Sequence, residues 1–120
     1  MHELPVTQGI LQTALDASER NGARRILSIQ LVIGELSSIV DDSVQFYFEQ
    51  LSQGTLAENA VLQFRREPTN VYCFDCAQTF PVRAPLPSEC PHCGGAHLRA
   101  EGSRDFYIES IEVEDEASGR

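Results

Sequence analysis

The sequence contains no lysine. Its 9 basic residues are all arginines, and 18 acidic residues give the 120-residue chain a formal net charge of −9. A protein that binds nucleic acid needs a basic face for the phosphates, and this composition offers no obvious one. We therefore expect no nucleic-acid binding. The acidic balance suits a protein that meets a basic surface on a partner or that handles a cation.

Long apolar runs are also missing. No segment approaches the roughly 18 consecutive apolar residues of a membrane span, so we expect no membrane partner. The first residues, Met-His-Glu-Leu-Pro, lack the basic start and apolar core of a secretory signal. We expect a cytoplasmic protein, and disulfides rarely persist in the cytoplasm.

Four cysteines are present, and they form two pairs. Cys73 and Cys76 enclose two residues, Cys90 and Cys93 enclose two more, and the full spacing is C-x2-C-x13-C-x2-C. Two tight turns that each present two thiolates match the tetrahedral preference of zinc. The spacing therefore predicts a structural zinc site.

Other interpretations of the cysteines fit less well. A thioredoxin-like motif needs one Cys-x-x-Cys at a helix start, not two pairs in a Pro/Gly-rich stretch. The run Cys90-Pro-His-Cys-Gly is similar to a rubredoxin knuckle, but the gap between the pairs is short for an iron site of that kind. His92 and His97 remain alternative metal ligands, because imidazole also binds zinc.

Nothing in the sequence indicates an enzyme. It has no catalytic triad pattern and no glycine-rich phosphate loop. A zinc ion held by four cysteines also leaves no coordination position open for water.

Periodicity predicts two helices and three strands outside the cysteine region. The helices are expected over residues 4–21 and from 41 to about 54, and the strands over 25–34, 60–67 and 106–113. In the first strand the alternation places Leu27, Ile29, Leu31 and Ile33 on one face. Asp41-Asp42-Ser43 offers N-cap side chains to the second helix. The last strand shifts phase between Ile108 and Ile111, which suggests a bulge.

Residues 69–100 differ in character. Prolines and glycines cluster there and large apolar side chains are few, so we expect metal binding rather than a core to supply the folding energy. The order of elements predicts an α+β fold: a small three-stranded mixed sheet with two helices on one face, plus an inserted zinc-ribbon-like module. We expect an α/β domain of residues 1–68 and 101–120 and a zinc-binding domain of residues 69–100.

The amino terminus offers a second kind of metal chemistry. The amine of Met1, the backbone nitrogen of His2 and its imidazole can close fused chelate rings on one metal ion. Amide nitrogens and imidazole favour square-planar nickel(II) or copper(II). The first helix begins almost at once, so we expect a folded surface to hold this short terminus.

Together these features resemble the HypA/HybF family of hydrogenase nickel-insertion accessory proteins. The resemblance covers roughly residues 1–114. It rests on Met1-His2-Glu3, on Val32-Ile33-Gly34-Glu35-Leu36-Ser37, on both cysteine pairs and on the closing segment 108–114.

The resemblance implies a nickel metallochaperone. Nickel would be bound transiently by His2, by the Met1 amine and by the backbone nitrogens of His2 and Glu3, with the Glu3 carboxylate tuning the site or contacting a partner. The four cysteines would hold structural zinc. The implied partners are a HypB-type GTPase, the large subunit of [NiFe]-hydrogenase and, for some members, urease maturation proteins. The alternative is a zinc-ribbon adaptor between proteins without a nickel role.

Overall fold

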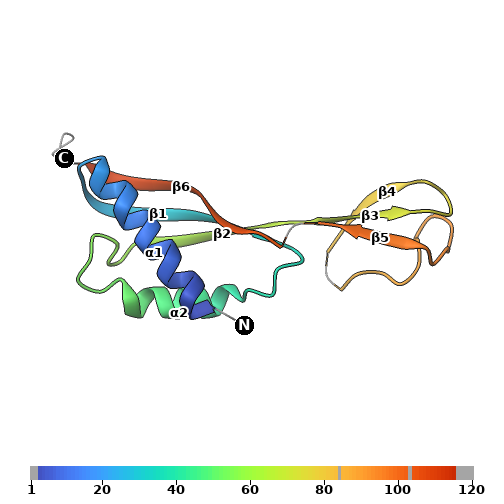
Figure 1. Ribbon diagram of the computed structural model, residues 1–120, viewed down its shortest axis with the longest axis horizontal. Coiled ribbons are helices and arrows are strands. Elements are labelled where there is room, and N and C mark those ends of the chain that lie inside the picture. The colour runs from blue at the N-terminus through green and yellow to red at the C-terminus, as the bar shows by residue number, and fades with distance from the viewer. Residues whose placement is uncertain (1–2, 84, 103, 116–120) are drawn as a thin grey trace. The chain divides into compact units, whose positions relative to one another are not determined.

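The computed structural model describes residues 3–83, 85–102 and 104–115. They form two helices and six strands (Figure 1). The helices are α1 (Glu3–Arg20) and α2 (Asp41–Leu51). The strands are β1 (Ala23–Gly34), β2 (Val61–Glu67), β3 (Thr69–Cys73), β4 (Thr79–Val82), β5 (Leu98–Glu101) and β6 (Phe106–Asp115).

The chain divides into two compact units. The first, called the α/β unit, comprises the described parts of residues 1–32, 38–65 and 106–120. The second, called the cysteine unit, comprises the described parts of residues 33–37 and 66–105.

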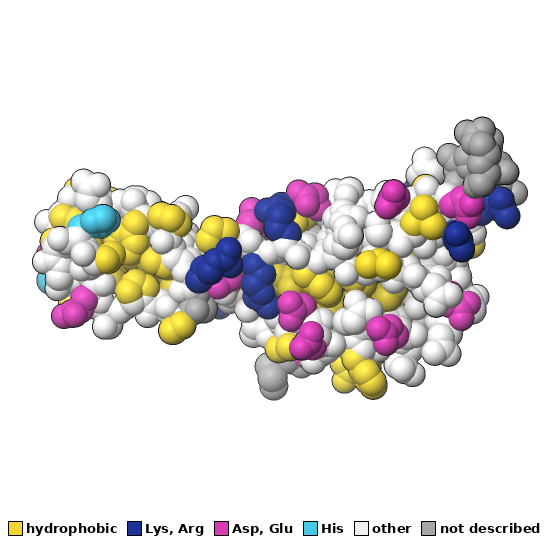
Figure 2. All heavy atoms as spheres, turned by 180° about the vertical axis from the view of Figure 1, so that it is seen from behind, with side chains coloured by type: hydrophobic (Ala, Val, Ile, Leu, Met, Phe, Trp, Pro, Cys, Tyr) yellow, Lys and Arg dark blue, Asp and Glu magenta, His cyan; other side chains and the backbone are white. Residues whose placement is uncertain are grey.

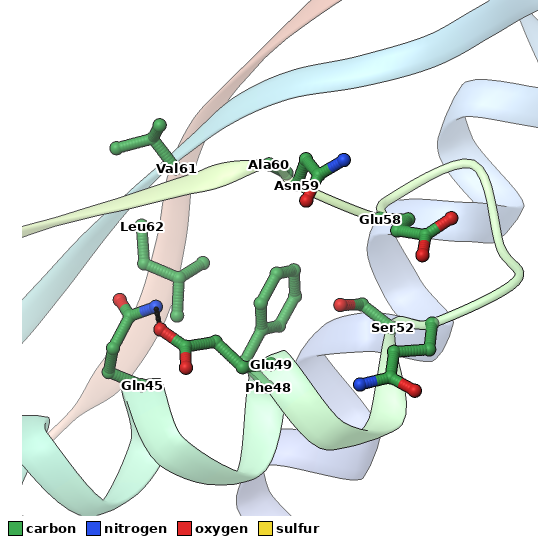
Figure 3. A pocket seen from close by; sticks show the side chains of 10 residues that line it. Gln45, Phe48, Glu49, Ser52, Glu58, Asn59, Ala60, Val61 and Leu62 are labelled. Carbon is green, nitrogen blue, oxygen red and sulfur yellow. Dashed lines mark hydrogen bonds between the residues drawn. The ribbon is translucent and has the colours of Figure 1, made fainter.

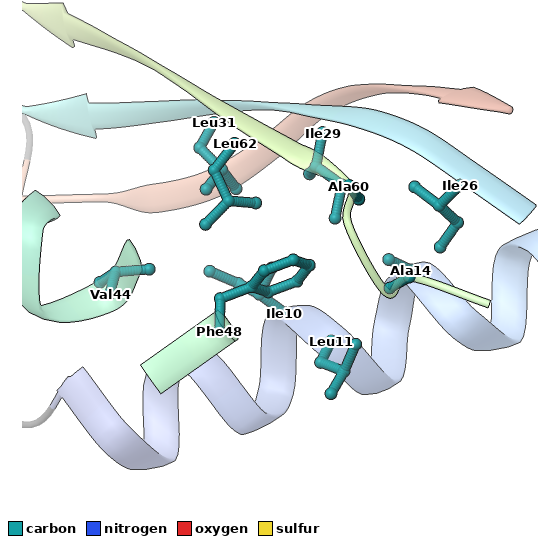
Figure 4. Packing of buried hydrophobic residues seen from close by; sticks show 11 residues of the cluster. Ile10, Leu11, Ala14, Ile26, Ile29, Leu31, Val44, Phe48, Ala60 and Leu62 are labelled. Carbon is teal, nitrogen blue, oxygen red and sulfur yellow. The ribbon is translucent and has the colours of Figure 1, made fainter. Parts of the chain in front are cut away.

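A three-stranded sheet of order β2-β1-β6 forms the framework of the α/β unit. Strands β1 and β2 run in the same direction and β6 runs in the opposite one (Figure 4). The helix α2 provides the crossover that a parallel β1–β2 pair requires. Both helices lie on one face of the sheet, so the predicted mixed sheet with two covering helices is confirmed.

The core of the α/β unit lies between this face and the helices (Figure 4). Phe48 of α2 and Ala14 of α1 are buried against β1. Ile29 and Leu31 point into the core as predicted, but Ile26 takes the place expected for Leu27, which is only half-buried. The Ile26 N–H donates to the carbonyl oxygen of Leu56 at 2.8 Å, so at this point β1 is held by the loop after α2.

Strand β6 carries the phase shift that its sequence predicts. Phe106 and Ile108 pack against the core, and so do Ile111 and Val113. The residues between these pairs are exposed. With this shift of phase, both halves of the strand face the core.

Polar pairs occupy the opposite face of the sheet. Ser28 donates to Glu112 at 3.0 Å. Arg25 and Glu114 form an ion pair at 2.9 Å, and so do Arg65 and Glu109 at 2.8 Å. On the surface seen in Figure 2, arginine and acidic side chains lie beside one another. Exposed pairs of this kind contribute little stability.

The start of α2 differs from its prediction. Val40, not the Asp41-Asp42-Ser43 segment, is the N-cap residue, and a valine side chain offers no hydrogen bond there. The carboxylate of Glu3 on α1 instead accepts the Val40 N–H at 3.0 Å. Asp41 and Asp42 fall in the first turn of α2, where carboxylates still favour the helix dipole.

The cysteine unit has its own sheet, of order β4-β3-β5 and antiparallel throughout. The sequence did not predict these strands, which are only four or five residues long. The expectation that this segment buries no core also needs correction. Val71, Cys73, Phe80 and Cys90 form a small buried cluster. Because two of its four members are cysteines, this core and the metal-binding chemistry are built from the same residues.

No helix among the described residues is long and apolar enough to cross a membrane.

Candidate metal centre

Each cysteine pair lies in a turn closed by the same two backbone hydrogen bonds. In the first turn, the Ala77 N–H donates to the Cys73 carbonyl at 2.8 Å, and the Cys73 N–H donates to the Gln78 carbonyl at 2.9 Å. In the second turn, the Gly94 N–H donates to the Cys90 carbonyl and the Cys90 N–H donates to the Gly95 carbonyl, both at 2.8 Å. The two turns are therefore structural copies, which explains why both pairs have the spacing C-x2-C.

The residue after each pair adopts the left-handed backbone conformation. Gly94 has φ +76°, and Ala77 has φ +59°. Glycine adopts this conformation without steric cost, whereas a side chain rarely does. The first turn therefore keeps the geometry of the second despite an unfavourable residue.

The turns bring all four sulfur atoms together. The Sγ atoms of Cys73, Cys76, Cys90 and Cys93 lie within 4.8 Å of one another. Two S···S distances join the turns, 3.6 Å between Cys73 and Cys93 and 3.7 Å between Cys76 and Cys90. Four sulfurs about 2.3 Å from a tetrahedral zinc ion lie about 3.8 Å apart. The donor set therefore fits a closed four-thiolate zinc site.

Backbone N–H groups surround the cluster and favour thiolates. The His92 N–H donates to Cys90 Sγ at 3.3 Å, and the Gly95 N–H donates to Cys93 Sγ at 3.4 Å. Burial raises the pKa of the Cys90 thiol, but the N–H groups of Cys93 and His92 outweigh it and lower the pKa to about 7. At Cys76 burial dominates and raises the pKa to about 12. A divalent cation would stabilise all four thiolates together.

The two histidines considered as ligands lie outside this cluster. His97 Nδ1 lies 3.0 Å from Asp75 Oδ2. The ring of His92 packs edge-on against Phe80, with 5.7 Å between centroids. Among the described residues, the group able to hold a metal ion consists of the four cysteines.

Contacts between the turns also involve residues that the sequence did not single out. A Cβ at Gly95 would overlap the Asp75 side chain, so a larger residue there would force Asp75 to move. The backbone continues the β3–β5 pairing here, because the Phe74 N–H donates to the His97 carbonyl at 2.9 Å. No sequence signal links these residues, since they are about twenty positions apart.

The predicted nickel site falls partly outside the described residues, which exclude Met1 and His2. Glu3 begins α1 and is 9 % exposed. The Thr7 hydroxyl donates to the Glu3 carbonyl at 2.5 Å, and the Glu3 carboxylate accepts the Val40 N–H. The first turn of α1 is therefore fixed to the start of α2.

Comparison with known proteins places these features in a family. The family model "Hydrogenase/urease nickel incorporation, metallochaperone, hypA" matches residues 1–113. The hydrogenase maturation factor HypA of Dehalococcoides mccartyi strain CBDB1 is 44 % identical over 117 residues, which cover 98 % of both chains. HypA of Geobacter sulfurreducens is 40 % identical over 95 % of this chain and 100 % of its own.

A solved structure supports the fold independently. The solution structure of the nickel metallochaperone HypA from Helicobacter pylori matches with a TM-score of 0.64. The match covers 96 % of this chain and 99 % of that one, at 22 % identity. On the strength of the family match and of relatives alike along nearly their whole length, this chain belongs to the HypA family of hydrogenase and urease nickel-incorporation proteins.

Proposed function

We propose that this protein is a nickel metallochaperone for the maturation of [NiFe]-hydrogenase. It binds Ni(II) at its amino terminus and delivers the ion together with a GTPase partner. The observation that carries this proposal is membership of the HypA family over residues 1–113, joined to a terminus whose residue types suit nickel.

The nickel ligands in this proposal come from the first three residues. The Met1 amine, the imidazole of His2 and the backbone nitrogens of His2 and Glu3 supply a nitrogen-rich set, which suits square-planar nickel. Support comes from the burial of Glu3 and its bond to Val40, because a fixed helix start limits how far the terminus can move. Glu3 then acts as a positioning residue through its side chain.

Zinc has a structural role in this proposal. Cys73, Cys76, Cys90 and Cys93 would hold it, and their spacing and sulfur distances support that assignment. Zinc in such a site cross-links the two turns and supplies folding energy. Residues 69–100 form the zinc-binding domain, and residues 1–68 and 101–120 carry the nickel terminus.

The two sites differ in how they exchange metal. A four-thiolate site surrounded by protein releases its ion slowly. A terminal site of nitrogen ligands is open and loosens when His2 or the amine is protonated. One chain can therefore keep zinc permanently and carry nickel transiently.

The partners proposed are a HypB-type GTPase and the hydrogenase large subunit. The family description also includes urease, so urease maturation proteins are a second class of recipient. We place the metallochaperone and these partners in the cytoplasm.

The test is a nickel titration of untagged protein by calorimetry, with zinc content measured in parallel. We expect His2→Ala to abolish nickel binding while zinc stays at one ion per chain, because only the nickel site uses that imidazole. His92→Gln is the matched control and should bind nickel normally. Equal nickel affinity in His2→Ala and the unaltered protein would contradict the proposal and leave the zinc-ribbon adaptor as the better account.

A further inference from the structure

A cavity of about 470 Å3 opens on the α/β unit between the end of α2 and the start of β2 (Figure 3). None of its residues belongs to either metal site. The cavity is lined by Gln45, Phe48, Glu49, Ser52, Gln53, Glu58, Asn59, Ala60, Val61 and Leu62.

The cavity combines an apolar floor with an acidic rim. Phe48, Ala60 and Leu62 are buried members of the core. The carboxylates of Glu49 and Glu58 are exposed on the rim. One oxygen of Glu49 accepts a hydrogen bond from Gln45 Nε2 at 2.8 Å, and its other oxygen is available to a ligand.

A buried hydroxyl faces the same space. Ser52 is 2 % exposed, and in Figure 3 its hydroxyl points toward the space beside Phe48. A hydroxyl in this position can donate to or accept from a hydrogen-bonding group of a ligand.

The loop that forms one wall of the cavity is held in place before any ligand arrives. The Ser52 carbonyl accepts both the N–H of Thr55 at 3.0 Å and its hydroxyl at 2.6 Å. Further along the loop, the Ala60 N–H donates to the Ala57 carbonyl at 2.9 Å. Asn59 has φ +68°, a conformation that asparagine tolerates better than most residues. A wall fixed in this way costs little ordering entropy on binding.

We propose that this cavity binds a cationic side chain, arginine or lysine, of a partner protein. Its alkyl stem would cover the apolar floor, as such stems do on protein surfaces. Its charged head would lie at the rim, where the Glu49 and Glu58 carboxylates attract it, and would hydrogen-bond to the Ser52 hydroxyl. Guanidinium fits best, because it offers five donors in one plane and the rim offers several acceptors.

Charge and position both favour a basic partner. The chain carries a net charge of −9 and no lysine, so a complementary partner surface is positive. Strand β2 is an edge strand of its sheet, and Val61 beside the cavity is 55 % exposed. A partner segment can therefore lie along β2 while one side chain enters the cavity. This binding does not depend on nickel.

The test is an NMR titration of the full chain with Nα-acetyl-arginine methylamide as the probe and its citrulline analogue as the neutral, nearly isosteric control. We expect saturable shifts at Ser52, Gln53 and Asn59 with the arginine probe and none with citrulline. The variant E49Q/E58Q should bind the probe at least fivefold more weakly. The matched control D16N/E19Q removes two charges from α1, outside the cavity lining, and should change affinity less than twofold.

Three results would overturn the proposal. One is equal weakening in both double variants, which would indicate diffuse electrostatic attraction. Another is no saturable response at the cavity residues, or the same response to the citrulline analogue. The third is an equal response to magnesium chloride, which would assign the acidic rim to a metal cation.

Discussion

At the scale of single residues, Glu3 has two roles in the proposed nickel site, one through its backbone and one through its side chain. It supplies a backbone nitrogen to the proposed ligand set, while its buried carboxylate accepts the N–H of Val40 at the start of α2. A carboxylate that accepts a backbone N–H at a helix start replaces a side-chain cap. The residue next to the proposed nickel ligand His2 thus also joins α1 to the start of α2.

We expect Glu3→Ala to lower the thermal midpoint by about 4 °C and to weaken nickel binding about tenfold, because the first turn of α1 loses its anchor. Calorimetry and thermal unfolding measure the two effects. Glu3→Gln is the control: its amide oxygen can still accept the Val40 N–H, so it should retain most of the stability and affinity. If Glu3→Ala binds nickel as well as the unaltered protein, the side chain has no positioning role.

The backbone conformation of Ala77 could not be predicted from sequence. The spacing of the cysteines predicted two equivalent turns, and Gly94 fits the left-handed position of the second. Nothing in the sequence indicated that Ala77 adopts the same conformation at φ +59°. The backbone bonds that close both turns impose it.

At the scale of elements, the long periodic segments could be predicted from sequence. Short strands and features that depend on distant contacts could not. Phe106, Ile108, Ile111 and Val113 gave the phase shift of β6 correctly. Ile26 rather than Leu27 faces the core, and its N–H is bonded to the carbonyl of Leu56. A contact to a residue thirty positions away cannot be predicted from the local alternation. The cap of α2 was mispredicted for the same reason, since its partner Glu3 lies 37 positions away.

The strands of the cysteine unit were missed because they are too short to show a period. Their residues form a core in which sulfur takes the place of larger apolar side chains: Cys73 and Cys90 are 0 % and 3 % exposed. Such a core is too small to fold unaided, so zinc should decide whether β3, β4 and β5 form.

We expect Cys73→Ala to lose zinc and to unfold residues 66–105, while the core around Phe48 stays folded. Amide NMR spectra measure both units at once: the signals of the cysteine unit should collapse to narrow dispersion, and those of α1 and α2 should remain. Removal of zinc from the unaltered protein by a chelator should give the same spectrum. A dispersed cysteine unit without metal would show that zinc is not its scaffold.

At the scale of the whole molecule, each unit has its own core and its own proposed metal. The family match covers residues of both units. The cysteine unit brings four sulfurs into one cluster that could hold a metal ion, and a closed site of this kind suits permanent binding. The α/β unit carries the amino terminus, the anchored Glu3 and a separate cavity with an acidic rim.

The fold class and the clustering of the four cysteines followed from sequence because periodicity and C-x2-C spacing are local signals. The cavity did not, because Glu49 and Glu58 look like ordinary exposed acids until α2 and β2 are folded together. The net charge of −9 and the absence of lysine in the chain indicated only that a partner surface would be positively charged. The apolar floor and the buried hydroxyl of Ser52 became visible in the structure.

The most direct test of the central claim is the position of the Met1 amine. Calorimetric titration with nickel should compare the unaltered chain with one carrying three extra residues, Gly-Ser-Gly, before Met1. Because the extension removes the free amine from its place beside His2, we predict at least tenfold weaker nickel binding, with zinc content unchanged. Nickel affinity equal to that of the unaltered chain would contradict a site built on the amino terminus.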